Sequence, residues 1–186
     1  SSMSRLFRPN QRVPVGRYDS FLITPLSFRE FLRFGKQTKA IEILDKFEQS
    51  LSGAHVSDFL HNELLKLLDA YLQVGGLPTA VLAYWAGEDY QRVIRNIFLS
   101  QEDDFIRKTS LENKALFRQG LKGIASFLGF ASTHTHIHVS HYMAEKVLTL
   151  LKAWHLVYEV DQHGVSSTSS FYPKRYIYDI GMAQFV

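Results

Sequence analysis

The sequence contains no cysteine among its 186 residues, so disulfide bonds, thiolate metal sites and a cysteine nucleophile are excluded. No apolar run approaches the roughly 20 residues that a membrane-spanning helix needs. The first residues also lack the apolar core of a signal peptide. We therefore expect no membrane partner, and the absence of cysteine fits a reducing, cytoplasmic location.

A phosphate-binding loop is also missing. Such a loop needs Gly, four residues and then Gly-Lys-Ser/Thr, because its backbone amides and lysine surround phosphate groups. Gly35-Lys36 is the nearest approach, but Glu30 stands at the position of the first glycine and Gln37 at that of the hydroxyl. Asp103-Asp104 lack the apolar strand that precedes a metal-binding aspartate. We expect that this chain alone does not hydrolyse ATP.

The composition is that of a folded protein, with 46% hydrophobic, 13% aromatic and 21% charged residues. The net charge of +3 and a pI near 9.1 permit nucleic acid or an acidic surface as a partner without requiring either.

Helical spacing dominates the chain, which predicts a mainly α fold. Ser27 with Glu30 forms a capping box for a helix that Gly35 ends, and Gly75-Gly76-Leu77-Pro78 separates two later helices. The alternating pattern of residues 18–24, closed by Pro25, predicts a strand. Helices are expected over residues 28–34, 39–51, 56–73, 79–85, 88–108 and 113–130.

A different pattern follows residue 133. Ser140 is a suitable N-cap for a further helix, and residues 157–161 and 176–180 are expected to form two strands. The order helix, helix, two-stranded ribbon is that of a winged helix. A soft domain boundary is expected near residue 110.

Two motifs allow nucleotide chemistry. Arg17 precedes the strand of residues 18–24, where a guanidinium can reach a neighbouring subunit's γ-phosphate, although a surface salt bridge is the simpler interpretation. The glycines of Gly75-Gly76-Leu77-Pro78 permit close approach of a ligand, and Pro78 opens a helix whose amides can face phosphate. A plain turn between helices is the alternative.

The chain resembles bacterial and archaeal AAA+ ATPases that carry a C-terminal module with a restriction-endonuclease-like fold. The motifs that carry this resemblance occur in the family's order over the whole chain. They are Ser1-Ser2 after the sensor strand, Gly16-Arg17, Pro25-Leu26-Ser27-Phe28-Arg29-Glu30-Phe31, Gly75-Gly76-Leu77-Pro78 and the segment Tyr176–Ala183. The nucleotide core before these motifs and the nuclease-like module after Val186 are not part of this sequence.

The resemblance implies three parts: residues 1–24 as the end of an α/β P-loop core, 25–110 as a helical lid and 111–186 as a winged helix. It implies that Arg17 acts as an arginine finger in trans, and that Gly75, Gly76 and Pro78 contact the nucleotide. The intact parent would bind ATP and Mg²⁺, assemble as a homo-oligomer and pass its nucleotide state to an effector module.

A DNA-binding regulator is the alternative function, with residues 25–110 as a dimerisation or sensor domain. Its candidate phosphate contacts are Lys146, Lys152, Lys174 and Arg175. Glu145, Glu159 and Asp161 dilute this positive charge, and a winged helix can also serve only to pack against the lid. A protein-interaction module is the third possibility.

Two further clusters have simpler interpretations. His134, His136 and His138 share one face of an extended segment and His141 follows, but side chains in a row do not converge on a metal, so we expect no metal site. The acidic run Glu102-Asp103-Asp104 precedes Arg107 and Lys108 by one helical turn. We interpret it as a solvated, ion-paired helix face.

Overall fold

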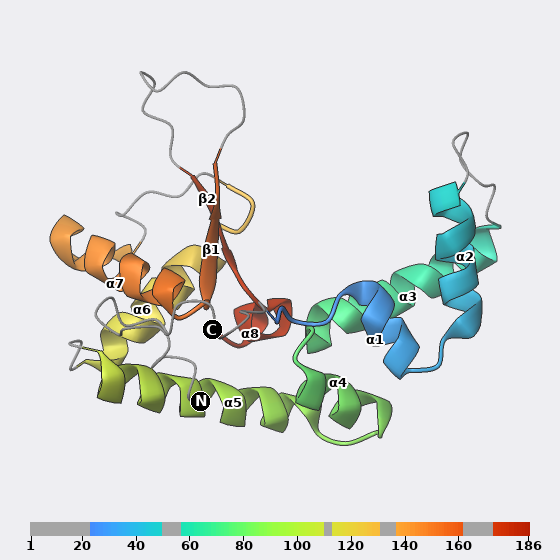
Figure 1. Ribbon diagram of the computed structural model, residues 1–186, viewed down its shortest axis with the longest axis horizontal. Coiled ribbons are helices and arrows are strands. Elements are labelled where there is room, and N and C mark those ends of the chain that lie inside the picture. The colour runs from blue at the N-terminus through green and yellow to red at the C-terminus, as the bar shows by residue number, and fades with distance from the viewer. Residues whose placement is uncertain (1–22, 50–56, 110–112, 131–136, 162–172) are drawn as a thin grey trace, which may run out of the picture. The chain divides into compact units, whose positions relative to one another are not determined.

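The computed structural model describes residues 23–49, 57–109, 113–130, 137–161 and 173–186. It is mainly helical, as the sequence predicts (Figure 1). Two compact units are present: a helical unit of residues 25–97 with 179–185, and a ribbon unit of residues 98–178. No helix in the described ranges is long and apolar enough to cross a bilayer.

The helical unit is organised around the aromatic side chain of Phe31. The capping box of Ser27 and Glu30 starts α1, and the ring centroid of Phe31, which is fully buried, lies 5.0 Å from that of Trp85 and 5.5 Å from that of Tyr71. Helix α1 therefore packs against both α3 and α4 (Figure 1). The helices of this unit are α1 (Phe28–Phe34), α2 (Thr38–Gln49), α3 (Asp58–Val74), α4 (Pro78–Trp85), residues 90–97 of α5 (Tyr90–Lys108) and α8 (Ile180–Phe185).

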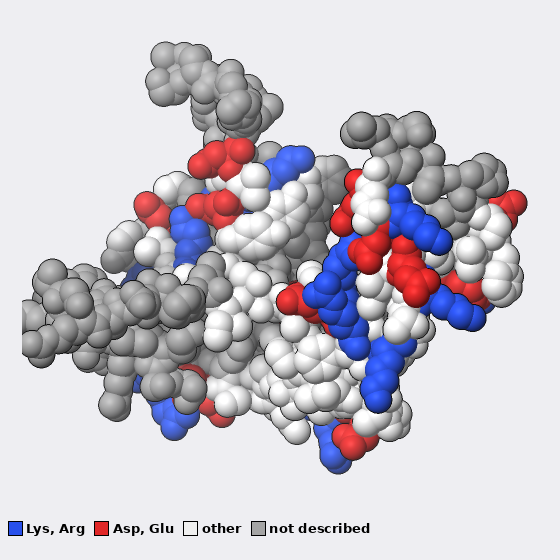
Figure 2. Space-filling model, turned by 45° about the vertical axis from the view of Figure 1, so that its right-hand side comes forward, with Lys and Arg blue, Asp and Glu red and all other residues white. Residues whose placement is uncertain are grey.

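Ion pairs connect α2 to α1. The guanidinium of Arg29 on α1 binds Asp45 and, at 2.6 Å, Glu48, both on α2. Positive and negative side chains are interspersed over this part of the surface (Figure 2).

The ribbon unit has the order that the sequence predicts for a winged helix. It comprises residues 98–108 of α5, α6 (Lys114–Ala125), α7 (His141–Ala153), β1 (Val157–Val160) and β2 (Lys174–Ile177). The strands pair antiparallel, with Val157 opposite Ile177 and Glu159 opposite Arg175. Helix α7 packs on β1 and α6 packs on β2 (Figure 1).

Aromatic side chains fill the core of the ribbon unit. The ring centroid of Phe105 lies 4.9 Å from that of Phe117 and 5.3 Å from that of Trp154. Gly120 of α6 lets α7 approach, since a Cβ there would lie 2.6 Å from a methyl carbon of Val147. The core thus joins residues 98–108 of α5 to both following helices.

Several elements differ from the sequence predictions. The second strand covers residues 174–177 rather than 176–180, and Ile180 begins α8, a helix that the periodicity did not indicate. The division between units falls at residues 97 and 98, inside α5, rather than near residue 110, because the aromatic core of the ribbon unit includes Phe105. Of the strand predicted over residues 18–24, only residues 23 and 24 are described.

The interpretation of Glu102 as part of a solvated face is wrong. Its side chain is only 1% exposed and receives two hydrogen bonds from Arg118 of α6, at 2.6 and 2.9 Å. The reason is helical spacing, because Glu102 shares the face of Phe98 and Phe105 at positions i, i+4 and i+7. Asp104 does form the expected pairs with Arg107 and Lys108.

Candidate functional site

The loop Gly75-Gly76-Leu77-Pro78 connects the end of α3 to the start of α4. Gly75 has φ +76° and donates its amide to the carbonyl of Tyr71 at 2.7 Å, which ends α3. Pro78 occupies the first turn of α4, and the N-cap residue Leu77 offers no side-chain hydrogen bond. The start of α4 therefore has no side-chain cap from its own N-cap residue.

Asp179, which is distant in the sequence, binds this loop. Its carboxylate accepts a hydrogen bond from the amide of Gly76 at 2.7 Å and one from the amide of Met182 at 2.9 Å. The amides of Gly181 and Leu77 also donate to it. One carboxylate thus caps the start of α8 and also holds the loop before α4, although 103 positions separate Gly76 from Asp179 in the sequence.

The carboxylate of Asp179 is buried. The residue is 3% exposed, and burial raises the pKa of its carboxyl group, while the four amide hydrogen bonds oppose that rise by stabilising the anion. No basic side chain is among the groups that shift this pKa. Backbone dipoles rather than a counter-charge therefore stabilise the anion.

The opposite side of the loop is held by the segment before α1. The amide of Leu26 donates to the carbonyl of Gly76 at 2.7 Å, and the hydroxyl of Tyr71 donates to the carbonyl of Leu26 at 2.8 Å. Burial, followed by the charges of Asp179 and Glu30, raises the pKa of that hydroxyl. The loop is therefore fixed between Leu26 on one side and Asp179 on the other.

The glycines are needed because these segments approach so closely. A Cβ on Gly75 would lie 2.5 Å from a carboxylate oxygen of Asp179, and one on Gly76 would lie 2.3 Å from the carbonyl oxygen of Leu26. A Cβ on Gly181 would lie 2.4 Å from the carbonyl oxygen of Val74. Each contact is shorter than real Cβ contacts, so a side chain at any of the three positions would force the segments apart.

This geometry revises the nucleotide contacts predicted for the loop. Gly75 and Gly76 are buried, and the approach that they permit is that of Asp179 and Leu26. A phosphate could reach the amide of Gly76 only by displacing the carboxylate of Asp179. The contact predicted for Pro78 remains a prediction, and Pro78 is exposed at the start of α4.

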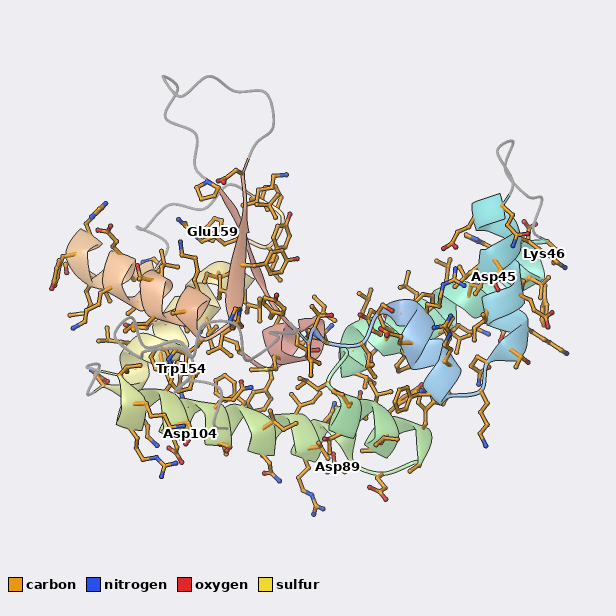
Figure 3. The ribbon with its side chains drawn as sticks, viewed as in Figure 1. Asp45, Lys46, Asp89, Asp104, Trp154 and Glu159 are labelled. Carbon is orange, nitrogen blue, oxygen red and sulfur yellow. The ribbon has the colours of Figure 1, made fainter. Side chains whose placement is uncertain are left out.

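The basic residues predicted to contact DNA differ in their exposure and in their ion pairs. Arg175 is 5% exposed and binds Glu159 at 2.7 Å, which argues against the predicted phosphate contact. Lys152 is exposed and binds the same carboxylate at 2.6 Å (Glu159 is labelled in Figure 3). Lys146 is half-buried and Lys174 is exposed, and neither pairs with an acidic side chain in the described part of the chain.

Glu159 is the centre of this small ion network on β1. Burial would raise the pKa of its carboxyl group, but hydrogen bonds from Lys152 and Arg175 outweigh burial and lower it. The reason that Arg175 is buried is the register: it stands opposite Glu159, on the ribbon face that the helices cover.

The remaining predicted sites fall outside the described residues in whole or in part. Arg17 is not among the described residues, and neither are His134 and His136. Within the described ranges, no group of three or more His, Asp or Glu side chains is placed to hold a metal ion.

Asp179 is the residue whose role sequence reasoning missed. The signal was nevertheless present, because an aspartate followed at once by Ile-Gly-Met-Ala matches the N-cap preference of a short helix. Its second partner, Gly76, could not have been found in this way, since the contact is tertiary.

Comparison with known proteins places this arrangement within one family. The sequence model of a domain of unknown function (DUF8612) matches residues 65–186, a range that includes the Gly75–Pro78 loop, the ribbon unit and Asp179. No curated protein and no solved structure matches the chain. The chain belongs to the DUF8612 family.

Proposed function

We propose that the chain is the lid and winged-helix part of an AAA+ type ATPase, which responds to ATP held by a P-loop core rather than hydrolysing ATP by itself. The observation that supports this most is the convergence of three sequence motifs. Pro25–Ser27, Gly75–Pro78 and Asp179–Gly181 are far apart in the sequence, yet they meet at the loop that leads into α4. Motifs that converge on one helix start indicate that the position of this helix matters.

The exposed face of α4 is the surface that we assign to the nucleotide. Pro78 and Thr79 are exposed, and Leu82, one turn later on the same face, is 55% exposed. An apolar edge of this kind suits the flat face of an adenine ring. We assign the phosphates and Mg²⁺ to the core, because the amides of Gly76 and Leu77, just before α4, already donate to Asp179.

Chain connectivity offers a route from this surface to the ribbon unit. Strand β2 ends at Ile177, and Asp179 follows after a single residue. Helix α5 also continues without a break from residues of one unit into residues of the other. A shift of α4 on nucleotide binding would therefore be transmitted to β2 through Asp179. Arg17 would act separately, on the nucleotide of a neighbouring subunit.

The experiment uses the protein extended upstream through the predicted core, with ATP affinity and turnover measured for two leucine variants. Leu82→Glu should weaken ATP binding because it puts a carboxylate on the proposed adenine surface. Leu65→Glu is the matched control, since Leu65 is 46% exposed on α3. Arg17→Ala should lower turnover and leave ATP binding intact. Equal ATP affinity for the two leucine variants would contradict the assignment of the α4 face.

A further inference from the structure

The β1–β2 ribbon has one covered and one open face. Alternation along each strand directs Val157 and Glu159 of β1, with Arg175 and Ile177 of β2, toward the helices. The opposite side chains form what we call the tyrosine face. It consists of Tyr158, Val160, Lys174, Tyr176 and Tyr178.

Three rings on this face form a contiguous aromatic surface. Tyr158 and Tyr176 stand directly opposite each other and stack, with centroids 5.3 Å apart and ring planes 19° apart. Tyr178 meets Tyr158 edge-on at 5.5 Å. Tyr158 remains 42% exposed and Val160 remains 46% exposed, so the described residues leave much of the face open.

The charge on the tyrosine face is positive. Lys174 is exposed opposite Val160 and pairs with no carboxylate in the described ranges. Glu159 projects from the covered face, where Lys152 and Arg175 neutralise it. The next carboxylate along the chain, that of Asp161, lies beyond the end of β1. No acidic side chain therefore stands among the five residues of the face.

We propose that the tyrosine face binds single-stranded nucleic acid, with bases stacking on the rings and Lys174 contacting a backbone phosphate. Aromatic side chains on neighbouring strands, beside a basic group, are the elements that single-strand-binding surfaces combine. A duplex does not offer its base faces to such a surface. A protein partner is less favoured because Val160 is the only aliphatic side chain of the face. This proposal does not depend on the proposed ATPase role.

The test measures fluorescence anisotropy of a labelled oligothymidine, as a single strand and as a duplex with oligoadenosine, on addition of the 186-residue chain. Tyr158→Leu and Tyr176→Leu should each weaken single-strand binding by about five- to a hundredfold, whereas Tyr158→Phe should keep it. Lys174→Gln should make the dependence of log affinity on log salt shallower by about 0.7. Tyr142→Leu is the matched control, because Tyr142 is 72% exposed on α7.

Thermal unfolding of each variant separates loss of binding from loss of fold. If a leucine variant does not fold, Lys174→Gln still decides the question, because an unchanged salt dependence of single-strand binding in this variant would overturn the proposal. Wild-type affinity in the folded leucine variants, or equal binding of strand and duplex, would overturn the proposal. The proposal would also be overturned if the tyrosines were needed for binding a protein but their replacement left the affinity for oligonucleotides unchanged.

Discussion

Replacing Asp179 by alanine should destabilise the helical unit more than loss of an ordinary helix cap would. In the wild type, the buried amides of Gly76 and Met182 donate to Asp179 at 2.7 and 2.9 Å. The variant leaves both amides without this acceptor. At about 1–3 kcal/mol for each unsatisfied amide, the expected loss is about 2–6 kcal/mol in the free energy of unfolding. Asp179→Asn should fall between the wild type and the alanine variant, because its amide group keeps one acceptor oxygen.

The control is Asp89→Ala. Asp89 accepts a hydrogen bond from the amide of Arg92 at 2.9 Å and caps α5, but it is exposed and ties no distant segment (Figure 3). Loss of this cap should lower the free energy of unfolding by about 0.5–2 kcal/mol. Urea unfolding followed by circular dichroism gives both values, and hydrogen exchange at the Gly76 amide reports the site itself. Equal losses for the two variants, with the Gly76 amide still protected in Asp179→Ala, would refute the reasoning.

Three further predictions test other contacts. Gly181→Ala should destabilise the chain by about 1–3 kcal/mol in urea unfolding, because its Cβ would lie 2.4 Å from a backbone carbonyl oxygen; an unchanged midpoint would show that α8 can shift. Arg118→Met should destabilise more than Glu102→Gln, since only the former leaves a buried carboxylate unpaired, and the reverse order in denaturant midpoints would contradict this. The pKa of Glu159 is lowered on folding, so its contribution is present above the unfolded value and is lost as pH falls through the folded value. The stability gap between wild type and Glu159→Gln, measured from neutral to acid pH, should therefore close at the acid end, and a constant gap would exclude an ionic role.

The parts of the fold that sequence predicted well are those fixed by neighbouring residues. The capping box of Ser27 and Glu30 predicted the start of α1, and the Gly75–Pro78 loop predicted the break between α3 and α4. Ser140 likewise caps α7 as expected, by accepting from the amide of Met143. Each signal acts within a few residues, so no knowledge of the tertiary structure was needed.

What the sequence could not supply were partners distant along the chain. The glycines at positions 75 and 76 indicated a close approach, but a pattern does not say whether a ligand or another segment approaches, and here it is Asp179 and Leu26. The burial of Arg175 was not apparent from the sequence, because β2 begins two residues earlier than predicted. Glu102, by contrast, carried a readable signal in its spacing from the aromatic residues of α5.

The most direct test of the central claim is hydrogen exchange of residues 75–82 in the protein extended through the predicted P-loop core, with and without ATP. The account predicts that ATP slows exchange at the start of α4, including the exposed turn of Pro78 to Leu82, while the buried amide of Gly76 stays protected in both states. Exchange at α4 that does not change although ATP is bound would contradict the assignment of this face. Failure of the extended protein to bind ATP at all would contradict the proposed function itself.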